Sequence, residues 1–292
     1  MPDGRAFEGP APISGRYRGG MTVRHRRVMQ VAAGGAVTWR SDDVSTEEPL
    51  EIRVGEVSLS VTMRTPGDDF DLVAGFLITE GIVRDAAEIA SMRMCPEADA
   101  ATGELNIVEV TLSASAASRE LTPRAFYMTS SCGLCGKASI EAVRTRSAYD
   151  VAEDPLRVSP ELMFGLPTSQ HSAQRQFART GGLHAAALFD DEGALLCLRE
   201  DVGRHNAFDK VIGWAATQRL LPLRSHIILA SGRASFELTQ KTLMAGIPLL
   251  AAVSAPSSLA VELAADSGMT LIGFLRGERM NVYAGHERIL RA

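Results

Sequence analysis

Hydrophobic and polar residues alternate in two neighbouring runs near the start of the chain, residues 50–54 and 57–63. The pair Gly55-Glu56 separates them, and two alternating runs joined by two residues predict a β-hairpin with a tight turn. Apolar residues then recur at helical spacing over 70–77, with Asp68 placed to cap this helix and Gly81 to end it.

The second half of the chain has a different period. Short apolar runs at 227–230, 248–253 and 270–274 are separated by helical stretches at 236–245 and 258–265. Alternation of buried strands with helices predicts a parallel sheet covered by helices. The fold class expected is therefore α/β.

These patterns suggest a division of the chain. Residues 21–125, which include another β-rich run at 105–112, are expected to form a small α+β domain, and 126–292 a larger α/β domain. Apolar residues of 184–189 and 194–198 predict a further hairpin in the larger domain. Residues 1–20, rich in Gly, Pro and Arg, are expected to form a disordered tail.

Composition narrows the class of protein. The 292 residues carry a net charge of −5, which argues against a protein that coats nucleic acid. We find neither an apolar run long enough to span a membrane nor a signal-peptide pattern. Four cysteines in a chain of this length do not form a disulfide framework, so a reducing, cytoplasmic setting is expected.

Polar loops follow the three predicted parallel strands, and the carboxyl ends of such strands share one sheet edge. Two of the loops, Ser231-Gly232-Arg233-Ala234-Ser235 and residues 254–258, lead into helix N-termini, which favour anions. The third contains Arg276 and Arg279, which with Arg233 suit phosphate. The pattern favours a pyrophosphate or nucleotide site, although small polar residues also make good turns and caps.

The segment 201–209 is dense in ionisable and amide groups and lies between a predicted strand and a helix. It contains Asp201, Arg204 and His205. A solvated capping loop is the simpler interpretation, but the density of His, Arg and Asn beside a glycine favours a site.

The pair Cys132 and Cys135 can share a metal, form a disulfide or relay sulfur. Structural zinc usually needs four ligands, and Cys95 and Cys197 are distant in sequence; we expect Cys197 to be a small buried hydrophobe. A zinc deaminase would need a glutamate where Ala186 follows His184.

A thioredoxin-like site would need a strand directly before the cysteine pair, and residues 127–131 make a poor one. Lys137 and a predicted helix N-terminus favour the thiolate form of the cysteines. Sulfur relay is therefore compatible with the pattern, although the spacing alone does not select it.

Four stretches of the chain together resemble the formate dehydrogenase accessory sulfurtransferases, the FdhD family. They are Ser131-Cys132-Gly133-Leu134-Cys135-Gly136-Lys137, Gly182-Leu183-His184-Ala185-Ala186, the run from Arg199 through Asp201-Val202-Gly203-Arg204-His205-Asn206 to Lys210, and Ser231-Gly232-Arg233. The resemblance extends from about Glu48 to the C-terminus.

The resemblance implies an activity. Family members take persulfide sulfur from a cysteine desulfurase and transfer it to the molybdenum cofactor in its bis-guanine-dinucleotide form, before the cofactor enters formate dehydrogenase. The sulfur-carrying cysteine corresponds to Cys132 and the second cysteine to Cys135. The resemblance also implies a homodimer and a three-layer cytidine-deaminase-like fold for the larger domain.

In the family the guanine dinucleotide site corresponds to Phe274–Arg279, which agrees with the third strand-end loop. The residues expected to bind this substrate are Phe274, Leu275, Arg276, Gly277, Glu278, Arg279, Ser231, Gly232, Arg233, His184, Asp201, Arg204 and His205. No bound metal is expected.

Two alternatives stay open at this point. One is a non-catalytic chaperone that shields the nucleotide-bearing cofactor. The other is a zinc-stabilised, deaminase-like protein, which would unfold on treatment with a chelator. The desulfurase, the choice of molybdenum or tungsten, and the dimer surface cannot be derived from the chain.

Overall fold

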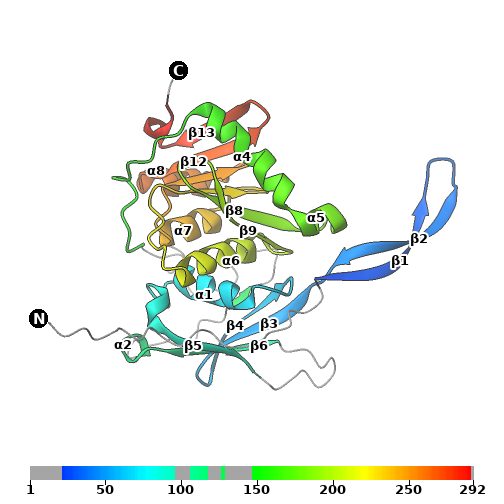
Figure 1. The fold of residues 1–292 in the computed structure, drawn as a ribbon, viewed down its shortest axis with the longest axis horizontal. Helices are drawn as coiled ribbons and strands as arrows, with labels where there is room; N and C mark the ends of the chain where they lie inside the picture. Colours follow the sequence, from blue (N-terminus) through cyan, green and yellow to red (C-terminus); the bar gives the residue numbers. More distant parts are fainter. Residues whose placement is uncertain (1–21, 96–105, 118–125, 129–146, 291–292) are drawn as a thin grey trace, which may run out of the picture.

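The computed structural model describes residues 22–95, 106–117, 126–128 and 147–290. It contains two β-sheets, with helices between them and outside, and a two-stranded ribbon that projects from this body (Figure 1). The predicted tail, 1–20, lies outside the described residues, and the division into two domains stays a prediction.

The alternating runs near residue 50 form the predicted hairpin, β3 (Glu48–Val54) and β4 (Val57–Arg64). A five-stranded sheet grows around it in the order β5-β6-β3-β4-β7. The added strands are β5 (Ile89–Met94), β6 (Ile107–Leu112) and β7 (Phe126–Met128). Strand β7 pairs with β4, so Tyr127 and Met128, which belong to the segment 127–131 predicted to make a poor strand, do extend this sheet.

Helix α1 (Asp69–Thr79) follows β4 and covers this sheet with an almost entirely buried sequence. Asp68 occupies the predicted capping position, but the prediction that it caps the helix is wrong. Its backbone is left-handed, with a φ of 53°, and its side chain makes no capping hydrogen bond. The carboxylate instead lies 3.4 Å from the guanidinium of Arg199. Short helical turns, η1 (Ala86–Glu88) and α2 (Ala114–Ala117), lie beside β5 and β6.

The second sheet has six strands in the order β13-β12-β11-β10-β8-β9. Its centre is the predicted parallel set, β10 (Ile227–Ala230), β11 (Leu249–Ala252) and β12 (Thr270–Arg276). On one side the predicted hairpin, β8 (His184–Phe189) and β9 (Leu195–Asp201), joins antiparallel to β10. On the other side β13 (Arg279–Ala284) folds back along β12, followed by η2 (His286–Arg288).

Helices cover both faces of this sheet: every residue of β10 and β11 is buried, and successive side chains point to opposite faces. Ile228 belongs to the core cluster with α6 (Arg204–Thr217), α7 (Phe236–Met244) and α8 (Ser258–Asp266). Its neighbour Ile227 belongs to the cluster with α4 (Pro160–Ala173). A short helix, α5 (Arg175–Thr180), continues from α4. The α/β class is confirmed, and the likeness to cytidine deaminases stays a prediction.

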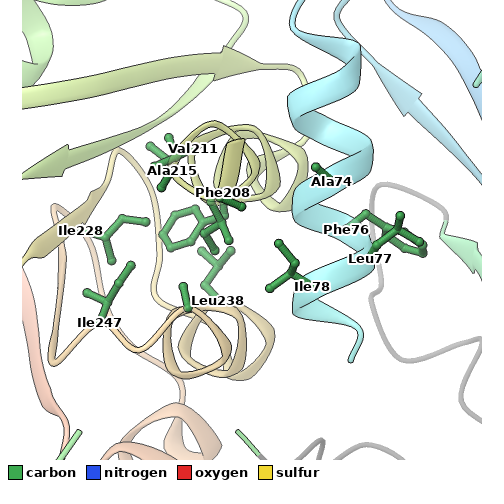
Figure 2. Close-up of a cluster of buried hydrophobic side chains, with 14 of the residues drawn as sticks. Ala74, Phe76, Leu77, Ile78, Phe208, Val211, Ala215, Ile228, Leu238 and Ile247 are labelled. Carbon is green, nitrogen blue, oxygen red and sulfur yellow. The ribbon is translucent and has the colours of Figure 1, made fainter. Parts of the chain in front are cut away.

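Helices α1 and α6 join the two sheets, and they pack backbone against backbone. A Cβ atom added to Gly213 would lie 1.8 Å from the carbonyl oxygen of Asp71, and one added to Gly75 would lie 1.9 Å from that of Asp209. Figure 2 shows Ile78 of α1 beside the cluster around Phe208, while other side chains of α1 point to its opposite side. One hydrophobic core therefore runs from the first sheet to the second.

The projecting ribbon consists of β1 (Val23–Val31) and β2 (Val37–Ser45), paired antiparallel along their whole length. It extends well away from the body (Figure 1). None of the helices in the described ranges is long and apolar enough to cross a bilayer.

Candidate functional site

One edge of the six-stranded sheet brings together residues from distant parts of the sequence. His184 begins β8 and pairs in register with Asp201 at the end of β9. Because β8 runs antiparallel to β10, the start of β8 lies beside the carboxyl end of β10. There the hydroxyl of Ser231 accepts a hydrogen bond from the amide of Ala185 at 2.8 Å. The nearest side-chain atom to a Cβ on Gly232 would be Nδ1 of His184, at 3.5 Å.

The loops after the parallel strands are hydrogen-bonded to one another. The amide of Ser254 donates to the carbonyl of Gly232 at 3.2 Å, and the amide of Phe274 donates to the carbonyl of Ser254 at 3.1 Å. Ala234 and Pro256 form a parallel bridge. The predicted convergence of the three loops on one edge is therefore confirmed.

The turn between β9 and α6 is fixed by the carboxylate of Asp201, which is fully buried. This carboxylate accepts from the amides of Gly203 and Thr65 at 2.8 and 3.1 Å. It also accepts from the side chains of Asn206 and Lys210 at 3.0 and 2.8 Å. Asp201 thus holds the turn, and its oxygens are occupied by the protein rather than turned to a substrate.

Asn206 ties the same turn to strand β4. Its amide nitrogen donates to the carbonyl of Met63 at 2.7 Å, and its oxygen accepts from the hydroxyl of Thr62 at 3.1 Å. Thr62 is also the register partner of Met128, the last residue of β7. The turn that begins α6 therefore lies beside the point at which β7 ends.

Three polar atoms at the starts of α6 and α7 are buried without a hydrogen-bond partner among the described residues, although Nε2 of His205 lies 3.9 Å from the carboxylate of Glu237. They are Nε of Arg204, Nε2 of His205 and Oγ of Ser235. The side chain of Ser235, at the N-cap of α7, makes no capping hydrogen bond. Buried polar atoms are nearly always paired in proteins, so unpaired groups at two helix N-termini indicate a site for a polar ligand.

The two histidines at this edge are held in the neutral form. Burial and the nearby Arg204 lower the pKa of His184. Burial, together with the positive charges of Lys241 and Arg204, lowers the pKa of His205 to about 3. Neutral imidazoles can both accept and donate a hydrogen bond near pH 7.

A pocket of about 630 Å³ opens beside His184. Ser231 and Val253 line it from the strand ends, while Gln170 lies on the α4 side and Gly182 follows α5. The side chain of Gln170 is itself buried and donates to the carbonyl of Leu229 at 2.9 Å. This volume is within the range of small-molecule sites.

The predicted segment Phe274–Arg279 is the hairpin turn from β12 to β13. Arg276 and Arg279 face each other across it and are exposed, and Nε of Arg276 donates to the carbonyl of Val253. Gly277 and Glu278 form the exposed turn itself. Leu275 differs from its neighbours, because it is fully buried in the cluster with α4 and not accessible to a substrate.

The cysteines fall into two groups. Cys132 and Cys135 lie outside the described residues. Cys197 is buried in β9, and burial raises the pKa of its thiol to about 12, so the prediction that it is an inert hydrophobe is confirmed. Within the described ranges, no group of three or more His, Cys, Asp and Glu residues is placed to hold a metal ion.

Sequence reasoning found the sheet edge but missed several residues that shape it. It named Ser235 only as the last residue of a strand-end loop, gave Lys210 no role, and did not anticipate the contacts of Thr62 and Thr65 with the 201–206 turn. Ser235 immediately before a helical stretch was the available signal, but it also has an ordinary interpretation as a cap. The contacts to β4 join residues more than 130 positions apart, which no local pattern reveals.

Comparison with known proteins gives consistent matches over most of the chain. Residues 45–290 match the model of the FdhD/NarQ family. The chain is 55% identical to the sulfur carrier protein FdhD of Mycolicibacterium paratuberculosis, over 90% of this chain and 97% of that protein. It is 54% identical to the sulfur carrier protein FdhD of Streptomyces avermitilis, over 94% and 98% of the two chains.

A solved structure has the same fold. It is the crystal structure of a protein described as a formate dehydrogenase accessory protein, from Desulfotalea psychrophila, with a TM-score of 0.72. At 24% identity it covers 92% of this chain and 100% of its own, and it supports the fold alone. From the family match and the identities over nearly full length, this chain belongs to the FdhD/NarQ family.

Proposed function

We propose that this protein is a sulfurtransferase that carries sulfur as a persulfide on Cys132. A cysteine desulfurase supplies the sulfur, and the acceptor is the molybdenum cofactor in its bis-guanine-dinucleotide form, before it enters formate dehydrogenase. Relatives more than 50% identical over nearly their full length are named sulfur carrier proteins, which supports the carrier role. We place the reaction in the cytoplasm, where thiols are kept reduced.

The observation that carries the proposal is the set of unpaired donors at the sheet edge. Arg204, His205 and Ser235 each present a buried polar atom without a hydrogen-bond partner among the described residues. The exposed Arg276 ends β12, and the exposed Arg279 begins β13. Forked guanidinium groups and free helix N-termini are the groups that bind a pyrophosphate, so this edge fits the dinucleotide part of the substrate.

Chain connectivity brings the carrier cysteine within reach of this edge. Met128 pairs with Thr62, whose hydroxyl donates to Asn206 in the turn that begins α6. Cys132 follows Met128 by four residues, and four residues span at most about 14 Å. This supports sulfur transfer from Cys132 at the edge that binds the nucleotide.

The transfer can be written with atoms and electrons in balance. The thiolate of Cys132 attacks the outer sulfur of the persulfide on the desulfurase, whose own cysteine leaves as a thiolate. Attack by Cys135 on Sγ of Cys132 then forms a disulfide and releases the outer sulfur, with its bonding electron pair, as hydrosulfide for the acceptor. A cellular dithiol reduces the disulfide before the next cycle.

The first test is mass spectrometry after incubation with a cysteine desulfurase and cysteine, without reductant. We expect one added sulfur atom on the peptide that contains Cys132, and none in Cys132→Ser. Cys95→Ser is the matched control and should carry the sulfur normally. An unmodified Cys132 with an active desulfurase would refute the carrier role.

The second test measures binding of GDP, as a probe of the guanine dinucleotide end, by titration calorimetry. Arg276→Ala and Arg279→Ala should each weaken binding about tenfold, since a charge-assisted hydrogen bond contributes about 1.5–3 kcal/mol. Arg53→Ala, which removes an arginine paired with Glu51 on the other sheet, is the control. GDP binding without sulfur transfer would favour the binding chaperone instead.

A further inference from the structure

The pocket beside His184 is lined by polar groups that carry no fixed charge. Among the described residues that line it there is no Asp, Glu, Lys or Arg. Its polar groups are the carboxamides of Gln170 and Gln174, two imidazoles and the hydroxyl of Ser231. Burial lowers the pKa of His184, so this imidazole is neutral near pH 7. Such a lining does not balance the charge of a phosphate, and it suits a neutral ligand with a hydrogen-bonding edge.

Gln174 is the unusual member of this lining. It lies at the junction where α4 ends and α5 begins, and it is only 6% exposed. Its side-chain amide makes no hydrogen bond with any of the described residues. Gln170, one helical turn earlier, instead donates to the carbonyl of Leu229 at 2.9 Å and serves the fold. Buried amides are nearly always paired, so the free amide of Gln174 indicates that a ligand completes its hydrogen bonds.

The chemistry of Gln174 selects the class of ligand. A carboxamide carries a donor and an acceptor side by side, so its complement is a ring in which an N–H lies next to a carbonyl. The ring of Phe177, which packs edge-on against His171 with centroids 6.3 Å apart, adds an aromatic wall to the same pocket. Pterin and guanine both present this edge on an aminopyrimidinone ring, and both are flat enough to pack against an aromatic side chain. The pocket, of about 630 Å³, has room for either.

The position of the pocket decides between the two rings. This step rests on the proposed function, in which the substrate has pterin at its metal-bearing end and guanine at the other. The arginines of the turn 276–279 stand at the β12–β13 end of the strand order, whereas the pocket opens at β10 and β8, beside Ser231 and His184. His184 is the register partner of Asp201, which holds the turn beside the end of β7. The pocket therefore lies at the end of the edge nearest the strand that leads into Cys132, where the metal must receive its sulfur.

We propose that this pocket binds a pterin ring of the cofactor, with the carboxamide of Gln174 paired to the adjacent N–H and carbonyl of the ring. The cofactor then lies along the sheet edge, with its pterin at β8 and β10, its phosphates at the helix starts and its guanine toward β13. Gln174 also determines which ring enters, because a ring without this edge leaves the amide unpaired in a buried site.

The test is calorimetric titration of the full-length protein with neopterin, a free pterin that contains neither phosphate nor sulfur. We expect the wild type to bind it and Gln174→Leu to bind it about tenfold more weakly, because the variant nearly keeps the size of the side chain and removes both hydrogen bonds. Gln218→Leu, which makes the same change at an exposed glutamine that ends α6, is the matched control and should bind like the wild type. No binding of neopterin by the wild type, or equal binding by the wild type and Gln174→Leu, would overturn the proposal.

Two further measurements address folding and the choice of ring. Neopterin should raise the melting temperature of the wild type and of Gln218→Leu more than that of Gln174→Leu, and Gln174→Asn, which keeps the amide but withdraws it by one methylene, should also bind neopterin more weakly. GDP should bind the wild type and Gln174→Leu equally. A GDP affinity that falls in Gln174→Leu while the neopterin affinity does not change would place guanine in the pocket and refute the proposal. Absence of sulfur on Cys132 after incubation with a desulfurase would refute the carrier role without altering neopterin binding, so the two failures are distinguishable.

Discussion

Replacement of Asp201 by Asn tests whether one buried ion pair holds the turn that begins α6. The carboxylate of Asp201 accepts from four donors, and the ammonium group of Lys210 is 2.8 Å away. The side chains of both residues are at most 2% exposed. Asparagine keeps the shape of the side chain but removes its charge, so the buried ammonium group of Lys210 keeps its hydrogen bond to the carbonyl of Thr65 and loses its counter-ion.

The expected loss of stability follows from this burial. Removing one partner of a buried ion pair costs about 3–5 kcal/mol, because the remaining charge has lost its compensation. Typical domains are stable by only 5–15 kcal/mol, so Asp201→Asn should unfold at a clearly lower urea concentration. Asp201→Asn/Lys210→Met removes both charges, and we expect it to recover at least about 1 kcal/mol relative to Asp201→Asn.

The assay is urea unfolding followed by circular dichroism, with Glu51→Gln as the control. Glu51 pairs with Arg53 at the surface, and loss of such a pair changes stability by less than about 1 kcal/mol. The reasoning is wrong if Asp201→Asn costs no more than this control. It is also wrong if the double variant is less stable than Asp201→Asn.

Two further predictions concern the helix start and the contact between helices. Because burial lowers the pKa of His205, the stability that its neutral form contributes is fully present above the usual pKa of 6.5 and is lost as pH falls toward 3. Between pH 7 and 5 the free energy of unfolding of the wild type should therefore fall by about 2 kcal/mol more than that of His205→Gln, as measured by urea titrations at each pH. An equal loss in both proteins would contradict this. Gly213→Ala places a Cβ 1.8 Å from the carbonyl of Asp71 and should cost at least about 1–3 kcal/mol. The control Gly165→Ala adds a Cβ to open space in α4 and should be neutral or stabilising; equal melting temperatures for both variants would refute the close contact.

Local patterns predicted the elements correctly where buried residues recur with the period of a strand or of a helix. The alternation around Gly55 and the apolar runs at 227–230 and 270–274 correspond to observed strands. The converging loops followed from these strands, because the ends of parallel strands share an edge. In such elements the buried face of the strand or helix determines where apolar residues occur, so the spacing of the apolar residues predicts the element.

The details that depend on distant contacts could not be predicted. Asp201 was expected to bind substrate, but it is satisfied by Thr65 and Lys210, one of which lies far away in sequence. Leu275 was included with an exposed turn, although its place in strand β12 turns it toward α4. The projecting ribbon was not anticipated, because its strands are largely polar and mostly exposed.

The contact of α1 with α6 determines the order in which this protein can fold on the ribosome. The central strands of the first sheet have all been synthesised when β6 ends at Leu112. Helix α6 begins 92 residues later, at Arg204. The same helix begins 125 residues after α1 ends at Thr79, so at about 5–20 residues per second α1 emerges roughly 6–25 s before the helix that covers its glycine face. During this interval that apolar face is open to chaperones and to other nascent chains. Slower synthesis lengthens this interval and thus the time for which the apolar face of α1 is exposed.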